Sequence, residues 1–170
     1  MPHPDRIIPV ARLSEGLRLC ARNIRDFVTE AELILTKGHG WHAIALAIFA
    51  FEELGKYAEL RRFRESSENK DSVPVPDALF RFHDYKQKLA RELVPEDAMI
   101  LLPTYFDSRY FSPEFFGTES VTPTPTLRTQ CVFVDWIDGD WRIGAPHDTE
   151  RLKKFLNAIM DSLNKLEVKG

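Results

Sequence analysis

The sequence predicts a mainly α-helical protein, a bundle of four to five helices with a small β-hairpin before the last helix. Three observations lead to this fold class. Apolar residues recur every three or four positions in several long stretches of the 170-residue chain, which is the period of an amphipathic helix. The stretch Ala43–Lys56 is apolar on nearly every side, as in a helix at the centre of a bundle. One short segment near the end of the chain favours strands instead.

The first helix is expected from about Leu13, and Lys37 and Gly38 are expected to end it. Its apolar residues step by four and three, and they are Leu13, Leu17, Cys20, Ile24, Phe27, Ala31 and Ile34. The second helix should run from about Trp41 to Arg64. A connection this short predicts that the two helices form an antiparallel hairpin.

The segments around the next helices contain proline and charge. Residues 1–10 are expected to form an extended lead, and Glu65–Pro76 is predicted to be a loop. Asp77 is expected to cap a third helix over about Ala78–Leu93. Pro95 has the position typical of the first turn of a short fourth helix.

The second half of the chain differs in composition. Residues 103–127 contain repeated prolines and many aromatic residues, which is typical of a long loop that is functional or contacts a partner. A β-hairpin is expected over residues 131–143. Asp148 or Thr149 should cap the last helix, whose apolar face consists of Leu152, Phe155, Leu156, Ile159, Leu163 and Leu166.

The bulk properties favour one domain over residues 1–170 in the cytoplasm. The net charge of −3 argues against broad, charge-driven binding of nucleic acid, although a local basic patch is still compatible with it. No apolar run reaches the roughly 18 residues of a membrane span, and the first residues lack the pattern of a signal peptide. Because there is no apolar run of that length, we expect no membrane partner. Cys20 and Cys131 suggest no disulfide framework, so we expect reduced thiols.

Charged residues of the second helix lie among apolar ones. At about 100° per residue, one stripe is expected to pack on the first helix and consists of Ile44, Ala47, Phe51, Leu54 and Ala58. A second stripe contains Glu53 and consists otherwise of Leu46, Phe49, Ala50, Tyr57 and Leu60. Glu52 also has apolar neighbours, and Gly55 would let another backbone approach. Because buried charge is costly unless it is paired, Glu52, Glu53 and Lys56 need specific partners.

The third helix offers matching polar residues. His83 and Lys86 fall within the apolar arc formed by Leu79, Phe82, Leu89, Ala90 and Leu93. The simplest pairing places His83 and Lys86 against Glu52 and Glu53. Two interpretations fit this cluster: an ion network that only fixes the register of the bundle, or a functional site.

Two other pairs have suggestive spacing. His39 and His42 are three residues apart, but without a third ligand nearby they are typical of surface or capping residues. Arg142 and His147 have four residues between them, with Gly144 and Pro146 in that interval. They are therefore expected in a turn before the last helix and not on one helical face.

Several motifs together resemble AbiV-type abortive-infection proteins. They are the run Glu52–Lys56 on a central helix, His83–Lys86 on the following helix, and Phe133–Trp136 with Gly139, Trp141 and Pro146 before the last helix. Each motif alone is weak, whereas their order and spacing are more specific. The resemblance covers roughly residues 13–163 and implies a HEPN-like helical bundle.

The same resemblance implies an action on RNA. Many HEPN proteins are dimers that cut RNA with an arginine and a histidine separated by four to six residues, and they need no metal or other cofactor. An internal 2′-hydroxyl is then the nucleophile, and the histidine acts as general acid or base. The matching pair here is Arg142 and His147, but it departs from the helical placement. His83 with Lys86 and Arg128 is an equally good catalytic set, with Glu52, Glu53 and Lys56 beside it.

Three hypotheses follow from these residues. The first is a phage-defence effector that acts on RNA as a metal-independent ribonuclease and forms a homodimer. The second is a non-catalytic interaction module of a defence or toxin–antitoxin system, which binds a protein partner through residues 103–127. The third is a metal site formed by Glu52, Glu53 and His83, which ranks last because Lys56 and Lys86 already supply cations.

Overall fold

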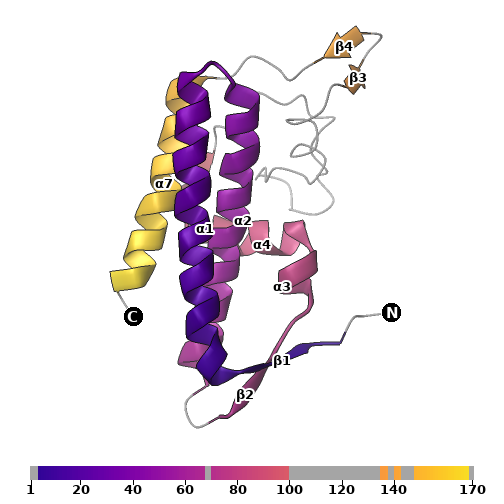
Figure 1. Cartoon of the computed structure of the whole chain (residues 1–170), viewed down its shortest axis with the longest axis vertical. Coiled ribbons are helices and arrows are strands. Elements are labelled where there is room, and N and C mark those ends of the chain that lie inside the picture. The colour runs from indigo at the N-terminus through magenta and orange to yellow at the C-terminus, as the bar shows by residue number, and fades with distance from the viewer. Residues whose placement is uncertain (1–3, 68–69, 100–134, 138–139, 143–147, 169–170) are drawn as a thin grey trace.

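The computed structural model describes residues 4–67, 70–99, 135–137, 140–142 and 148–168. Three long helices run alongside one another, which confirms the mainly helical class (Figure 1). They are α1 (Val10–Thr36), α2 (Gly40–Glu65) and α7 (Thr149–Val168). As predicted, α1 and α2 form a hairpin. Its connection includes Gly38, whose φ of 82° is a left-handed conformation that glycine adopts without strain.

The core lies around α2, whose buried residues face three other helices. Phe51 packs against Phe155 of α7 with ring centroids 5.5 Å apart. Phe49 and Phe27 of α1 are 5.6 Å apart by the same measure. The predicted orientation of α2 was therefore wrong: Phe51 belongs to the stripe assigned to the first helix, yet it packs on α7. The stripe with Phe49 and Glu53 faces α1 instead.

The predicted third helix is broken into two. The helices α3 (Ala78–Arg81) and α4 (His83–Arg91) meet at Phe82, which has extended backbone angles of −99° and 120° and a half-exposed ring. Phe82 is thus not part of an apolar helical face. Asp77 is at the expected N-cap position of α3, but its side chain makes no capping hydrogen bond, because its carboxylate pairs with Arg6 and Arg81. The short α5 (Glu96–Met99) follows Pro95, as expected.

Two of the segments predicted to be irregular pair as a small sheet. Strand β1 (Arg6–Pro9) lies in the expected extended lead, and β2 (Ser72–Val75) lies in the expected loop. They pair antiparallel, with Arg6 opposite Val75 and Pro9 opposite Ser72. This contact between residues more than 60 positions apart ties the start of α1 to the start of β2, where the backbone N–H of Val10 donates to the carbonyl oxygen of Asp71 at 2.9 Å.

The predicted β-hairpin is present before α7. It consists of β3 (Asp135–Ile137) and β4 (Asp140–Arg142), with Trp136 opposite Trp141. The predicted long loop over residues 103–127 lies outside the described residues. Asp148 caps α7 as predicted, since its Oδ1 accepts hydrogen bonds from the backbone N–H groups of Glu150 and Arg151 at 3.0 and 3.1 Å. Within the described ranges, no helix is long and apolar enough to cross a membrane.

Candidate functional site

Glu52 is the centre of a buried polar cluster between α2 and α4. Its side chain is only 3% exposed. One oxygen, Oε2, lies 2.6 Å from Nδ1 of His83 and 3.6 Å from Nζ of Lys86. The other oxygen accepts a hydrogen bond of 2.9 Å from Nε2 of Gln87. Each carboxylate oxygen therefore has polar partners that compensate for the loss of water.

The helical period of α4 explains why these partners converge. His83, Lys86 and Gln87 are related by i, i+3 and i+4, so they lie on one face of the helix. The predicted pairing of His83 and Lys86 with Glu52 is confirmed. Gln87 was missed, although its position four residues after His83 was a usable signal.

Gly55 lets α4 approach this closely. A Cβ atom placed on Gly55 would lie 2.0 Å from the carbonyl oxygen of Lys86 and 3.0 Å from the backbone nitrogen of Ala90. Both are backbone atoms of α4, which cannot move aside as a side-chain end can. The predicted close approach at Gly55 is confirmed, and it keeps Glu52 within hydrogen-bond reach of α4.

Glu53 does not join this cluster, which corrects the predicted pairing. It faces α1 and forms an ion pair with Lys56 on the same helix; the two side chains are 13% and 19% exposed. The Cys20 thiol of α1 lies beside Glu53. Burial, and next the neighbouring Glu53 carboxylate, together raise the pKa of Cys20 to about 12 against the opposing charge of Lys56. The thiol is therefore neutral and acts as a donor to Glu53.

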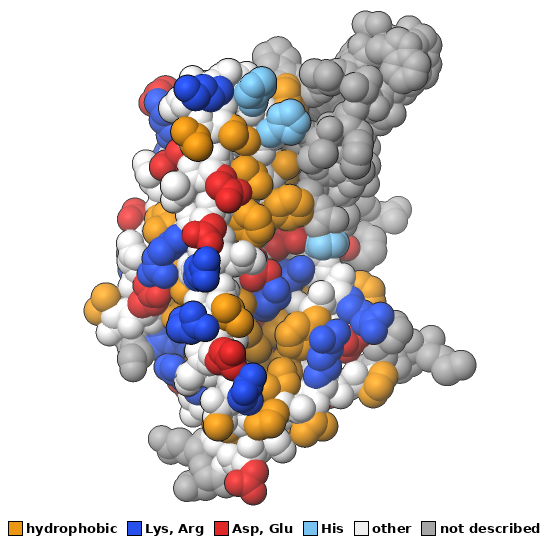
Figure 2. All heavy atoms as spheres, viewed as in Figure 1, with side chains coloured by type: hydrophobic (Ala, Val, Ile, Leu, Met, Phe, Trp, Pro, Cys, Tyr) orange, Lys and Arg blue, Asp and Glu red, His pale blue; other side chains and the backbone are white. Residues whose placement is uncertain are grey.

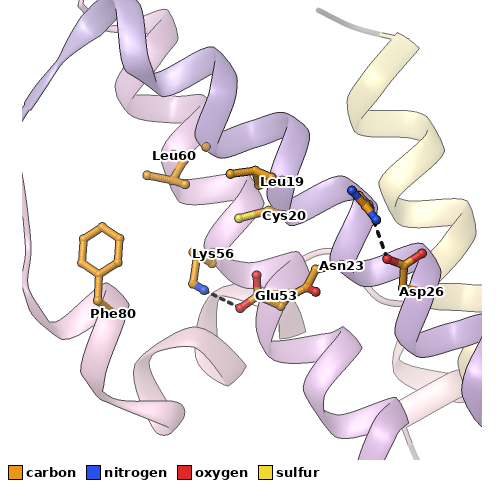
Figure 3. Close-up of a pocket in the computed structure, with 10 residues that line it drawn as sticks. Leu19, Cys20, Asn23, Asp26, Glu53, Lys56, Leu60 and Phe80 are labelled. Atoms are coloured by element: carbon orange, nitrogen blue, oxygen red, sulfur yellow. Dashed lines mark hydrogen bonds and ion pairs between the residues drawn. The ribbon is translucent and has the colours of Figure 1, made fainter.

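Glu53 and Lys56 lie at the floor of an open groove of about 550 Å³ between α1, α2 and α3. Leu19, Leu60 and Phe80 supply its apolar lining. Figure 3 shows Phe80 on one side of the groove and the Glu53–Lys56 pair on the other, with Lys56 on the side of the pair toward Phe80. Hydrophobic and charged side chains gather in this hollow between α1 and α3 (Figure 2).

A second buried carboxylate, Glu59, also lies between α2 and α4. Its Oε1 accepts hydrogen bonds from Arg62 at 2.6 Å and from the Tyr85 hydroxyl at 3.4 Å. Burial, and next the charge of Glu59, raise the pKa of Tyr85. Sequence reasoning missed this site, although Glu59 follows Glu52 by seven residues and so lies on the same face of α2.

The comparison with family models decides the identity of the chain. The AbiV model, of the HEPN group, matches residues 12–161, which is most of the chain. The chain belongs to the AbiV family. Membership confirms the resemblance seen in the sequence and assigns the protein to abortive infection, a form of phage defence. No curated protein and no solved structure matches the chain significantly.

The other predicted residues of this AbiV protein are not joined to the cluster by any described contact. Arg128 and His147 lie outside the described residues. Arg142 is in β4, where its backbone is opposite Asp135. His39 and His42 lie at the start of α2 with ring centroids 6.0 Å apart. Across the described ranges, no three His, Cys, Asp or Glu side chains are grouped so that they could hold a metal ion.

Within the cluster of this AbiV protein, exposure separates His83 from its partners. The His83 side chain is 30% exposed, whereas those of Glu52 and Lys86 are 3% and 7% exposed. Gln87 is fully buried. The contact with Glu52 favours a proton on Nδ1 of His83 and fixes the plane of the ring. An oriented histidine at the surface with a buried carboxylate behind it is suited to proton transfer.

Proposed function

We propose that this AbiV protein is a phage-defence effector that acts on RNA as a metal-independent ribonuclease, with His83 as its proton-transfer residue. The observation that carries the proposal is the buried Glu52 carboxylate 2.6 Å from Nδ1 of a partly exposed histidine. Membership of the AbiV family supports the role in defence.

The proposed reaction is attack of a ribose 2′-hydroxyl on the adjacent phosphorus. His83 takes the proton of that hydroxyl through Nε2, because Nδ1 faces Glu52. The O2′–P bond forms as the P–O5′ bond breaks, which leaves a 2′,3′-cyclic phosphate. The departing 5′-oxygen takes a proton from water or from a second acid, for which His147 is the candidate. Arg128 or Arg142 is proposed to balance the charge on the phosphate.

Lys86 and Gln87 act on this reaction through Glu52. Both are buried, so they reach the carboxylate and not an RNA strand in solvent. Lys86 offsets the charge of Glu52, and Gln87 binds the oxygen that His83 does not contact. Together they hold the carboxylate in place against His83.

The test is incubation of the purified protein with total RNA and with a tRNA pool, with and without a chelator. Wild type and His83→Ala, His147→Ala and Arg142→Ala are compared, with His42→Ala as the matched control because His42 is an exposed histidine of α2. We expect discrete fragments that persist in chelator and disappear in His83→Ala but not in the control. Fragments that persist in His83→Ala and disappear in His147→Ala would move the catalytic role to the pair Arg142 and His147.

The alternative function is a non-catalytic protein-interaction module. It is favoured by large hydrophobic side chains at the surface: Leu19 and Leu33 are 49% and 59% exposed. They are 14 residues apart on one side of α1, with the exposed Asp26 and Glu30 between them, so this side offers a partner two separate apolar contacts within a charged surface. This face also suits the proposed homodimer. Light scattering at micromolar concentration should give the mass of two chains for the wild type, and of one chain for Leu19→Ser/Leu33→Ser. A wild-type monomer contradicts the dimer.

Toxicity in cells separates the two functions. A ribonuclease loses toxicity with His83→Ala. An interaction module keeps toxicity in that variant and loses it when Leu19 and Leu33 are replaced, or when Phe115 and Phe116 of the predicted partner-binding segment 103–127 are replaced.

A further inference from the structure

The groove between α1, α2 and α3 has a donor and an acceptor side by side at its floor. The carboxylate of Glu53 and the ammonium of Lys56 form an ion pair, and both side chains are mostly buried, with 13% and 19% exposed. Both line the groove. A ligand in the groove would therefore meet one strong acceptor and one strong donor within a few ångströms of each other.

Both groups keep hydrogen-bonding capacity for a ligand. A carboxylate has about four lone-pair positions, and within the described part of the chain Lys56 and Cys20 account for two of those on Glu53. Lys56 has three N–H bonds, of which the ion pair needs one. The raised pKa of Cys20 keeps its thiol neutral. The charges that line the groove balance, Glu53 with Lys56 and Asp26 with Arg22, so the groove suits a neutral ring.

We propose that this groove binds a guanine base. The Watson–Crick edge of guanine presents an acceptor, O6, next to two adjacent donors, N1–H and N2–H. Glu53 accepts from N1–H and N2–H, and Lys56 donates to O6. This inference rests on the proposed action on RNA and names the base that the site selects.

The other bases match the floor less well. Adenine and cytosine each offer one amino donor beside a ring nitrogen that is an acceptor. The Glu53 carboxylate therefore accepts a single hydrogen bond from them, and its other oxygen faces the lone pair of that ring nitrogen. Uracil offers a single N–H between two carbonyl oxygens. A polar site built for three hydrogen bonds discriminates strongly against a ligand that leaves some of them unmade.

The walls of the groove suit a flat aromatic ring. Leu19 and Leu60 provide apolar contact, and Phe80 provides an aromatic face on which a base can stack. The guanidinium of Arg6 lies 4.3 Å from the centre of the Phe80 ring, which fixes that ring from one side. The volume of about 550 Å³ is within the range of small-molecule sites.

The groove adjoins the proposed catalytic cluster. Glu53 follows Glu52 directly on α2, and Lys86 is near enough to Cys20 for its charge to oppose the rise in the pKa of that thiol. His83 does not line the groove, so the phosphate next to a guanine held at Glu53 has to extend past the groove to reach it. Cleavage next to guanine is the consequence expected when it does.

Calorimetric titration of the full chain with single nucleotides tests the proposal. GMP should bind at least ~10-fold more tightly than AMP, CMP or UMP. Inosine monophosphate lacks only the N2 amino group and should bind at least ~5-fold more weakly than GMP. 7-Deaza-GMP keeps the whole Watson–Crick edge and should bind like GMP. Equal affinity for GMP, AMP and inosine monophosphate would overturn the proposal without any variant.

Variants locate the site. Glu53→Gln and Lys56→Gln should each weaken GMP binding at least ~10-fold. The control is Glu30→Gln, which changes an exposed carboxylate of α1 and should leave binding unchanged. Thermal melting identifies any variant that fails to fold. If a variant does not fold, the affinities of the wild-type chain for GMP and inosine monophosphate still test the proposal. Unchanged binding in folded Glu53→Gln would refute the assignment.

A short RNA with a single guanine separates this proposal from the catalytic one. Binding of that RNA with a guanine preference but without cleavage would support the base site and contradict the ribonuclease. Cleavage without any base preference would contradict the base site alone. Binding of GMP but not of the RNA would overturn the role in RNA recognition.

Discussion

Removal of the Glu52 carboxylate is the sharpest test of how the structure is held together. Glu52→Ala leaves the Lys86 ammonium, whose side chain is 7% exposed, without the carboxylate that it faces. It also leaves Nε2 of the fully buried Gln87 without its acceptor. Breaking one side of a buried ion pair costs about 3–5 kcal/mol. An unsatisfied amide donor costs about 1–3 kcal/mol, and the two terms overlap because they share one carboxylate.

We therefore expect Glu52→Ala to lower the free energy of unfolding by about 3–5 kcal/mol. For a chain of this size this corresponds to a Tm about 6–20 °C lower. Urea unfolding followed by circular dichroism at pH 7 measures it. Glu30→Ala is the control, because it removes an exposed carboxylate of α1 and should change stability by less than about 0.5 kcal/mol.

The double variant Glu52→Gln/Lys86→Met distinguishes charge from packing. Replacing both partners of a buried pair by neutral groups is often nearly neutral, so it should cost less than Glu52→Gln alone. A loss below about 1 kcal/mol in Glu52→Ala would refute the reasoning, since it would mean that water reaches Glu52 and Lys86. Equal losses in Glu52→Gln and in the double variant would show that the ion pair itself contributes nothing.

Four further substitutions test other contacts. Gly55→Ala should destabilise by about 1–3 kcal/mol or more in thermal melts, because its Cβ would meet the Lys86 backbone at 2.0 Å. Gly16→Ala should be neutral or stabilising by up to about 1 kcal/mol, because its Cβ would lie 3.6 Å from Leu60; equal effects of the two would contradict the close approach of α4. Phe51→Ala should lower the free energy of unfolding in urea by about 3–5 kcal/mol, because it leaves a cavity beside Phe155 in the core. A change near zero would mean that Phe51 is at the surface. The Cys20 thiol, with its pKa raised to about 12, stays protonated in the folded chain, whereas in the unfolded chain it ionises above about pH 9. Its contribution to the free energy of unfolding is therefore complete below that pH. As the pH rises toward 12, this free energy falls by about 1.4 kcal/mol per pH unit. Cys20→Ala should lack this pH-dependent loss in urea unfolding, and the same slope in both proteins would contradict the raised pKa.

The sequence by itself determined the elements whose signal is local. The three-and-four spacing of apolar residues gives α1 and α7 their faces, and α2 is marked by a stretch that is apolar on nearly every side. Asp148 marks the start of α7 through its side-chain chemistry. It also identified Glu52, His83 and Lys86 as a cluster, because charge on a buried helical face requires a partner on another element.

Only the tertiary structure decided which partners meet. Glu52 and Glu53 are about 100° apart on α2, so either could face α4 until the rotation of the helix is known. The packing of Phe51 on α7 fixes that rotation, and it turns Glu52 toward α4 and Glu53 toward α1. The break at Phe82 and the pairing of β1 with β2 likewise depend on contacts between distant residues. The periodicity of apolar residues indicates which side of a helix is buried. Which element packs against that side depends on the free energy of the whole packed core.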